Sequence, residues 1–281
     1  MRISDWAAVI LKGFSQVMLQ SNTVTGALFL AGIFINSWLL GLAALMGAAC
    51  STLTAISLKY DEADVRDGLY GFNGVLVGIA LTFIFGFSPT IVGLMLLGSG
   101  LSSVVMNLMQ KRGWPPYTFP FVVSTWLSLA LIDLFGLASQ ETGTRLDGGN
   151  LDVFSSVTLG FGQVMFQASA VTGVIFAAAL LVNSRRSALY ALMGSLTGMV
   201  VSSGLSLPVN LVNSGLFGYN GVLCALAFAD KKSGSIVYAL VSIVFSVFIM
   251  SGMASLEIAA LTSPFVLATW AASGLRTLRK R

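Results

Sequence analysis

The chain has 281 residues, of which 56% are hydrophobic and only 9% are charged, and its net charge is +4. Soluble domains carry about 25% charged residues, so this composition excludes a soluble globular protein and predicts helices that cross a membrane several times. The small positive charge gives no reason to expect nucleic-acid binding, because in a membrane protein the placement of Lys and Arg matters more than their sum.

The chain opens with a short apolar segment at 5–20, which is too short to cross about 30 Å of hydrocarbon. Lys12 interrupts the segment and no small-residue cleavage site follows, so we expect it to be retained rather than removed as a signal peptide. We interpret it as a half-membrane segment whose free backbone groups are covered by protein or by a water-filled cavity. Five apolar spans follow it, near 24–40, 41–58, 69–86, 89–109 and 118–136.

The second half of the chain repeats this arrangement after a polar, glycine-bearing linker at 138–153. A second short apolar segment lies at 154–168. Five further spans are expected near 170–184, 187–206, 213–229, 234–252 and 262–275. The sequence therefore predicts an all-α integral membrane protein of ten transmembrane helices, with a first repeat at 1–137 and a second repeat at 154–281, each with a half-membrane, re-entrant segment.

The basic residues predict the orientation of these spans. If the N-terminus is cytoplasmic, fourteen of the fifteen Lys and Arg residues fall on the cytoplasmic side and only Arg145 falls outside, as the positive-inside rule expects. Both termini are then cytoplasmic. Because five is an odd number, the second half enters the bilayer from the opposite face, which is the inverted-repeat design of many transporters.

Sequence motifs recur between the halves at a constant offset of 160 − 13 = 147 residues. GFSQVMLQSNTVTG from Gly13 returns as GFGQVMFQASAVTG from Gly160, with nine of fourteen positions identical. GLYGFNGVL from Gly68 likewise returns as GLFGYNGVL from Gly215. Two shorter pairs keep the same spacing: Met46-Gly47 with Met193-Gly194, and Asn36-Ser37 with Asn183-Ser184. Identity at polar and glycine positions argues against a duplicated scaffold without a site, because lipid-facing positions could exchange among Leu, Ile and Val.

The repeated polar residues are the candidates for a solute pathway, because a polar group buried in lipid costs free energy unless it is paired. They are Gln16 with Gln163, Gln20 with Gln167, Asn73 with Asn220, and Thr118 with Thr262. Gln16 and Gln163 are favoured, because free backbone carbonyls are also available at a broken helix end. For Asn73 and Asn220, simple bridging between helices is an equal alternative.

Charged residues are scarce in the expected spans, and this scarcity indicates the kind of solute. Asp133 and Glu257 lie close to predicted outer ends, and no buried pair of opposite charges repeats between the halves. A proton- or sodium-driven carrier more often places charges at mid-membrane. We therefore expect a pathway for a neutral solute.

These motifs together resemble the urea transporter family, in its bacterial type. The resemblance rests on the Gln-Val pair of each half-membrane segment, the GxxGFNGVL-type element and the Thr-x-Pro-Phe box that begins at Thr118 and again at Thr262. It implies facilitated transport of urea down its gradient, by a multi-pass protein of the bacterial cytoplasmic (inner) membrane. It also implies a homotrimer with one pore per protomer, no enzymatic activity and no cofactor.

The resemblance further implies which residues bind the solute. Gln16 and Gln163 would each accept a urea N–H in one of two end sites, and Thr118 and Thr262 would lie at the constriction between them. One flat slot would be formed by Val17, Leu19, Phe72 and Leu76, and the other by Val164, Phe166, Tyr219 and Leu223. Urea is planar and neutral, so a narrow apolar slot lined with carbonyl oxygens can replace its hydration.

Two positions depart from a symmetric pattern. Leu19 stands where the second copy has Phe166, so the two slots are expected to differ in tightness. Members of the family often carry an acidic or amide residue just after the half-membrane segment. Here the first copy has Asn22 and the second has Ser169, which leaves the role of this position open.

The alternatives are a channel for ammonia or short amides and, less readily, an integral-membrane enzyme. Ammonia channels use pore histidines and aquaporin-type channels use paired Asn-Pro-Ala boxes, and this chain has neither. An enzyme would need a nucleophile–base pair or a metal cluster. The absence of histidine removes the commonest metal ligand, and Cys50 and Cys224 lack a CxxC or CxxH partner, so we expect them to be core residues and expect no metal site.

Overall fold

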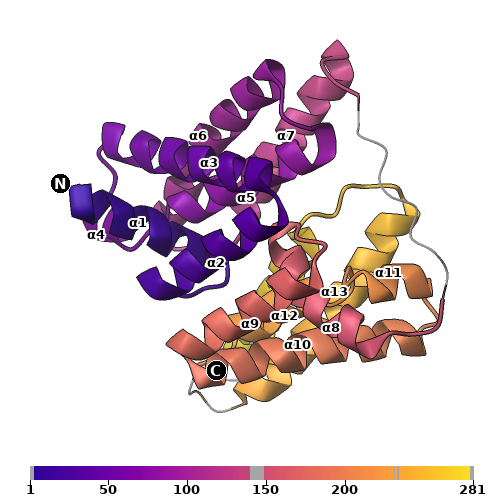
Figure 1. Cartoon of the computed structure of the whole chain (residues 1–281). Helices are drawn as coiled ribbons and strands as arrows, with labels where there is room; N and C mark the ends of the chain where they lie inside the picture. Colours follow the sequence, from indigo (N-terminus) through magenta and orange to yellow (C-terminus); the bar gives the residue numbers. More distant parts are fainter. Residues whose placement is uncertain (1–2, 140–148, 231, 233, 279–281) are drawn as a thin grey trace. The chain divides into compact units, whose positions relative to one another are not determined.

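The computed structural model describes residues 3–139, 149–230, 232 and 234–278, and the described secondary structure is all helical (Figure 1). The chain divides into two compact units, Met1–Gly143 and Thr144–Arg281. The centre of the expected linker and Arg145 lie outside the described residues. The same holds for Arg2, Lys231 and the basic residues at 279–281.

Seven helices make up the described part of the first unit. They are α1 (Ile3–Gln16), α2 (Thr23–Asn36), α3 (Trp38–Ser57), α4 (Glu62–Arg66), α5 (Gly71–Phe85), α6 (Pro89–Lys111) and α7 (Phe119–Phe135). Helix α5 packs against α3, α6 and α7, and α1 packs against α2 and α5. Helix α5 is therefore the centre of this unit, and residues 71–82 of it are buried.

The second unit has the same order of elements. It contains α8 (Val153–Gly162), the 3₁₀ turn η1 (Gln163–Met165), α9 (Ala170–Asn183), α10 (Arg185–Gly204), α11 (Val209–Asn213), α12 (Tyr219–Ala227), α13 (Ser235–Ser255) and α14 (Ser263–Leu278). The bounds of α9, α10 and α11 follow those of α2, α3 and α4 at both ends by the same 147 residues, as 170 − 23, 185 − 38 and 209 − 62 show for their starts. Helix α12 takes the central place of α5, between α10, α13 and α14.

Several helices are apolar, but few are long enough to cross a membrane alone. Among the described residues α3, α6 and α13 pass by length and composition, and α8–η1 with α9 adds a fourth if this pair, bent by 76°, is one broken span. Helices α2 and α9 have 14 residues each, which is about 21 Å of helix against about 30 Å of hydrocarbon. The structure thus supports an integral membrane protein with several apolar helices, and ten spans remain a prediction.

Two predicted boundaries were wrong for local reasons. The break expected between positions 40 and 41 lies at Ser37, whose hydroxyl accepts the backbone N–H of Leu40 and caps α3; Ser184 caps α10 in the same way. The span expected at 213–229 starts later than expected, because Asn213 is the last residue of α11 and α12 begins only at Tyr219. Between them Gly215 has a φ of +77°, which no helix accommodates.

The repeated Met-Gly pair marks a close helix crossing. A Cβ atom on Gly47 of α3 would lie 2.1 Å from the carbonyl oxygen of Gly74 on α5, and a Cβ on Gly194 of α10 would lie 2.3 Å from that of Gly221 on α12. Small residues allow helix backbones to approach in this way in membranes. Each central helix therefore packs closely against its neighbour at a glycine that is repeated in the sequence.

The second unit also has a polar clamp at the end of α14. Arg276 donates hydrogen bonds to Asp230 (3.1 Å) and to the Ser235 hydroxyl (3.1 Å), and its guanidinium lies over the rings of Phe228 and Tyr238. Partial burial raises the pKa of Asp230, but the hydrogen bonds from Ser235 and Arg276 outweigh it, so the pKa lies below its ordinary value. The clamp ties α14 to the loop that joins α12 and α13.

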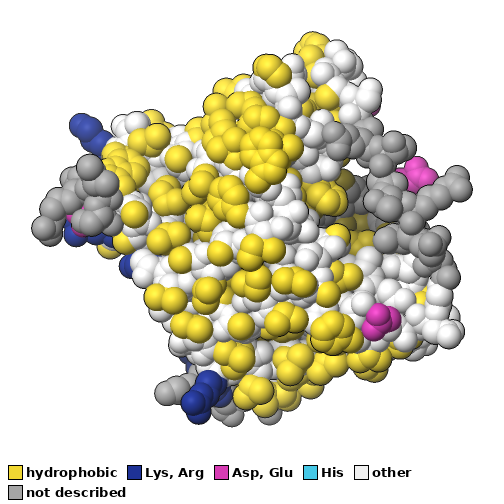
Figure 2. All heavy atoms as spheres, viewed as in Figure 1, with side chains coloured by type: hydrophobic (Ala, Val, Ile, Leu, Met, Phe, Trp, Pro, Cys, Tyr) yellow, Lys and Arg dark blue, Asp and Glu magenta, His cyan; other side chains and the backbone are white. Residues whose placement is uncertain are grey.

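The surface of the molecule fits a lipid environment. Large hydrophobic side chains are exposed on helices of both units, among them Leu97, Leu134, Leu189 and Phe248. Figure 2 shows hydrophobic side chains spread over the visible face, with few charged ones among them. A water-soluble protein rarely exposes apolar surface on this scale.

Candidate solute-binding site

The two short apolar segments, 5–20 and 154–168, end in the same unusual turn. In the first unit Leu19 has a φ of +57° and its N–H donates to the Gln16 carbonyl oxygen (2.9 Å). In the second unit Phe166 has a φ of +58° and donates to the Gln163 carbonyl oxygen (3.1 Å). A left-handed backbone at a bulky residue costs about 1–2 kcal/mol and persists only where its surroundings impose it. The strain therefore falls on Leu19 and Phe166, one of the slot positions at which the two copies differ.

Gln20 and Gln167 stabilise these turns. Gln20 donates through Nε2 to the Met18 carbonyl oxygen (2.9 Å), and Gln167 donates to that of Met165 (2.5 Å). Both side chains are buried. Because an N–H of each amide bonds to the turn itself, these glutamines are structural supports of the broken helix end.

The repeated glycine-rich element brings the central helix to this turn. A Cβ on Gly68 would lie 2.4 Å from the backbone nitrogen of Gly13 in α1, and a Cβ on Gly215 would lie 2.4 Å from that of Gly160 in α8. Both glycines also have positive φ, +75° and +77°. Only glycine meets both demands, so the element can seat the start of α5 or α12 directly on the half-helix.

The slot residues expected from the family resemblance lie on the elements that meet at this contact within each unit. In the first unit Val17, Phe72 and Leu76 are buried and Leu19 is half-buried. In the second unit Val164, Tyr219 and Leu223 are buried and Phe166 is half-buried, and η1 packs against α12. Each unit thus places its four slot residues on the broken helix end and on its central helix.

The two glutamines at the helix ends have different surroundings. Gln16 is 8% exposed and donates through Nε2 to the backbone carbonyl oxygen of Asp67 (3.0 Å). Gln163 is half-buried, and its side chain makes no hydrogen bond with another described residue. The repeated residues are therefore equivalent in sequence and not in local chemistry.

A charged cluster lies beside Gln16. The Asp67 carboxylate accepts from Lys12 Nζ (3.1 Å) and from the Ser21 hydroxyl (2.6 Å). The Ser21 hydrogen bond, aided by Lys12 and opposed by partial burial, holds the pKa of Asp67 below its ordinary value. Sequence analysis missed Asp67, because the position is not repeated and its partners come from a distant segment.

The Thr-x-Pro-Phe boxes begin α7 and α14, and the central helices hold them in place. Thr118 and Thr262 are buried just before the first helical residue. Asn73 accepts the backbone N–H of Phe121 through Oδ1 (3.1 Å), and Asn220 accepts that of Phe265 (3.2 Å). The asparagines therefore bridge helices, which was one of the two alternatives left open by the sequence.

The comparison with known proteins identifies the family. The family model for urea transporters matches residues 7–277. The chain belongs to the urea transporter family. Among curated relatives it is similar to urea transporter 1 of Rattus norvegicus, with 29% identity over 96% of this chain and 76% of the relative, and to urea transporter 1 of Ovis aries, with 29% identity over 94% and 75%.

The position after each broken helix end, Asn22 or Ser169, has a structural role in this family member. The Asn22 side chain accepts the backbone N–H of Thr25 (2.9 Å) and caps α2, and the Ser169 hydroxyl accepts that of Thr172 (3.3 Å) and caps α9. Asn and Ser are both good helix N-caps. The difference between the copies therefore leaves this function unchanged.

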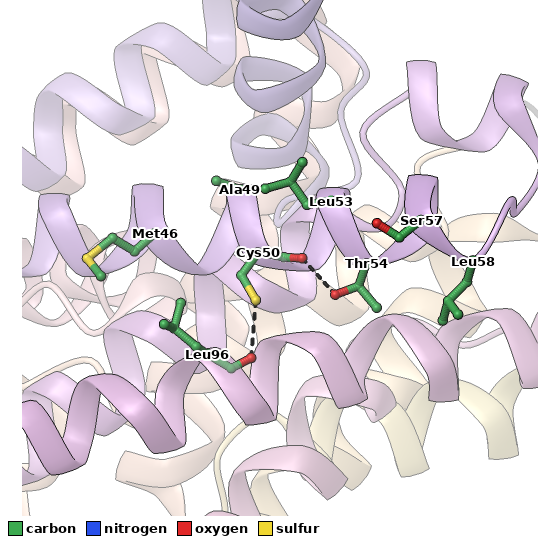
Figure 3. Close-up of a pocket in the computed structure, with 8 residues that line it drawn as sticks. All are labelled: Met46, Ala49, Cys50, Leu53, Thr54, Ser57, Leu58 and Leu96. Atoms are coloured by element: carbon green, nitrogen blue, oxygen red, sulfur yellow. Dashed lines mark hydrogen bonds between the residues drawn. The ribbon is translucent and has the colours of Figure 1, made fainter.

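A separate apolar pocket lies between α3 and α6 (Figure 3). Its lining residues are Met46, Ala49, Cys50, Leu53, Thr54, Ser57, Leu58 and Leu96. Its thiol and one of its hydroxyls are bonded to backbone, Cys50 Sγ to the Leu96 carbonyl oxygen (3.2 Å) and Thr54 Oγ1 to that of Cys50 (2.8 Å). The pocket contains none of the candidate urea-binding residues.

Over the described chain, no group of three or more His, Cys, Asp or Glu residues comes together as metal ligands.

Proposed function

We propose that this chain is a channel through which urea crosses the bacterial cytoplasmic membrane down its gradient, without a coupling ion. Facilitated transport of urea is the function of the family to which the chain belongs, and both cited relatives are named as urea transporters. The scarcity of charge in the apolar helices supports a neutral solute.

The proposed architecture consists of ten spans in two inverted repeats, at 1–137 and 154–281, joined by the linker at 138–153. The common 147-residue offset of three helix pairs supports an internal repeat. The placement of basic residues supports cytoplasmic termini. As in the family, three copies would assemble into a homotrimer with one pore in each protomer.

The proposed site is based on the broken helix end that is present in both units. Each end has a glutamine at its last turn and a residue with left-handed backbone three positions later. Gln16 and Gln163 would each accept a urea N–H at one mouth of the pore. Val17, Leu19, Phe72 and Leu76 would flatten the first slot, and Val164, Phe166, Tyr219 and Leu223 the second. Thr118 and Thr262 would line the constriction.

This arrangement would select urea by shape and by hydrogen bonding. A slot between apolar side chains admits a flat solute, and carbonyl oxygens at the broken helix end take the N–H bonds that water held. A hydrated ion is rejected, because apolar walls cannot replace its hydration.

The test is urea flux through proteoliposomes containing Gln16→Leu or Gln163→Leu. If the amides bind urea, each variant stays folded, its urea flux falls by the loss of a hydrogen bond of about 1 kcal/mol, and it discriminates less between urea and N-methylated ureas. Gln110→Leu, at a glutamine outside the proposed path, is the control for the change of residue type. Wild-type flux and selectivity in both well-folded variants would refute the site, and faster passage of formamide or ammonia than of urea would favour the alternative solutes.

A further inference from the structure

The hydrogen bond of Gln16 determines which way its amide points. A backbone carbonyl only accepts, so the NH₂ group faces the Asp67 oxygen at 3.0 Å and Oε1 must face the other way. No described residue donates to Oε1, and this atom is not among the buried unpartnered ones. Gln16 therefore offers a single oriented acceptor.

Asp67, whose carbonyl oxygen orients Gln16, is held through its carboxylate by residues on both sides of the broken helix end. Lys12 lies one helical turn before Gln16, Ser21 follows the broken end, and both bind the carboxylate of Asp67. The adjacent Gly68 presses against the backbone of Gly13. One residue thus joins the half-helix, the segment after it and the turn before α5.

The described residues of the second unit form no equivalent cluster. At the offset of 147 residues, Leu159 stands for Lys12, Ala168 for Ser21 and Ser214 for Asp67. The Ser214 hydroxyl donates to the Leu211 carbonyl oxygen of its own turn (2.9 Å). With no partner among the described residues, Gln163 can turn either its oxygen or its NH₂ group toward a solute.

We propose that Asp67, with Lys12 and Ser21, positions Gln16 as a fixed acceptor, so that the first slot recognises only the N–H edge of urea while the second slot accepts either edge. This inference rests on the proposed function, since it requires Gln16 to contact urea. Asp67 is a positioning residue, because it acts through Gln16. An acceptor already held in place loses less conformational entropy on binding, so the first slot is the more selective of the two.

The test compares Asp67→Ala and Lys12→Met with Glu62→Ala in oriented proteoliposomes. Glu62 lies on the adjacent α4, is exposed and pairs with Arg66 one turn away, so it controls for the loss of a carboxylate near the same mouth. We expect Asp67→Ala to raise the KM for urea about three- to tenfold and to weaken the preference for urea over N-methylurea by a similar factor, with the maximal rate and thermal unfolding little changed. Lys12→Met should act in the same direction and less strongly, and Glu62→Ala should leave both quantities at wild-type values.

A double variant separates this inference from the proposed function. If Asp67 acts through Gln16, adding Asp67→Ala to Gln16→Leu changes neither KM nor selectivity further. If Gln16→Leu alone changes neither quantity, the binding role of Gln16 in the proposed function fails. If Gln16→Leu impairs transport but Asp67→Ala does not, or if Glu62→Ala has the same effect as Asp67→Ala, the positioning inference is overturned. Should Asp67→Ala not fold, Ser21→Ala removes an exposed hydroxyl from the same carboxylate, and wild-type KM in both Ser21→Ala and Lys12→Met overturns it equally.

Discussion

Tyr219 makes a hydrogen bond that its counterpart Phe72 cannot make, and Tyr219→Phe tests its value. The Tyr219 hydroxyl donates to the Leu261 carbonyl oxygen, just before the first turn of α14. In a regular helix this carbonyl would accept from the N–H of Phe265, but that N–H donates to Asn220. The Leu261 carbonyl therefore depends on the Tyr219 hydroxyl.

Removing this hydroxyl leaves a buried carbonyl without its partner, and that should lower the free energy of unfolding by about 1–3 kcal/mol. Leu261 also has a φ of +48°, so the same bond helps to hold a strained residue. The next residue is Thr262 of the proposed constriction. We expect urea flux to fall several-fold, because Thr262 loses a fixed neighbour.

The measurements are equilibrium unfolding of the purified protein and stopped-flow urea flux in proteoliposomes. Tyr238→Phe is the matched control, since Tyr238 is half-buried and contributes its ring, over which the Arg276 guanidinium lies. Equal stability and equal flux in Tyr219→Phe and Tyr238→Phe would refute the reasoning.

Three further predictions follow from the path and from the fold. Thr118→Val and Thr262→Val keep side-chain shape and remove a hydroxyl, so each should slow urea flux by about 1 kcal/mol, or several-fold; unchanged flux in both single variants and in the double variant would place these residues outside the path. An imposed proton or sodium gradient should produce no accumulation of labelled urea above equilibrium, and accumulation would contradict a channel without a coupling ion. Arg276→Met should destabilise the second unit by about 1–2 kcal/mol at neutral pH. Because the folded pKa of Asp230 is lowered from 3.8, this contribution is fully present above pH 3.8 and is lost as the pH falls through the lower folded value; a difference from wild type that shrinks between pH 5 and pH 8 would contradict the assignment.

The membrane class and the family were readable from the sequence, and the sequence also supplied the candidates for the site. Hydrophobic composition alone indicated a membrane protein, because burial in lipid requires apolar side chains along whole helices. The constant offset of 147 residues indicated an internal repeat, and the repeated motifs indicated the urea transporter family, which the family comparison confirms. The site glutamines were selected because a polar residue in an apolar segment needs a physical reason.

Element boundaries were less predictable than element types. Hydropathy contains no signal for the cap at Ser37 or for the left-handed backbone at Gly215. One expected span therefore continued past the turn at Ser37, and another began before the turn at Gly215. Left-handed conformations at Leu19 and Phe166 could not be read from residue type either, because bulky residues disfavour them.

The sequence by itself determined the membrane class, indicated the repeat and selected the pair of glutamines as candidates, because these are properties of residue type and spacing along one dimension. Only the tertiary structure decided what each polar group does. It brings the Asp67 carbonyl to the Gln16 amide across 51 residues of chain and the Asn220 side chain to the N–H of Phe265 across 45. Since a hydrogen bond forms between groups that folding brings within about 3 Å, Gln16 and Gln163, identical in the two repeats, differ in their partners because Asp67 has no counterpart in the second repeat.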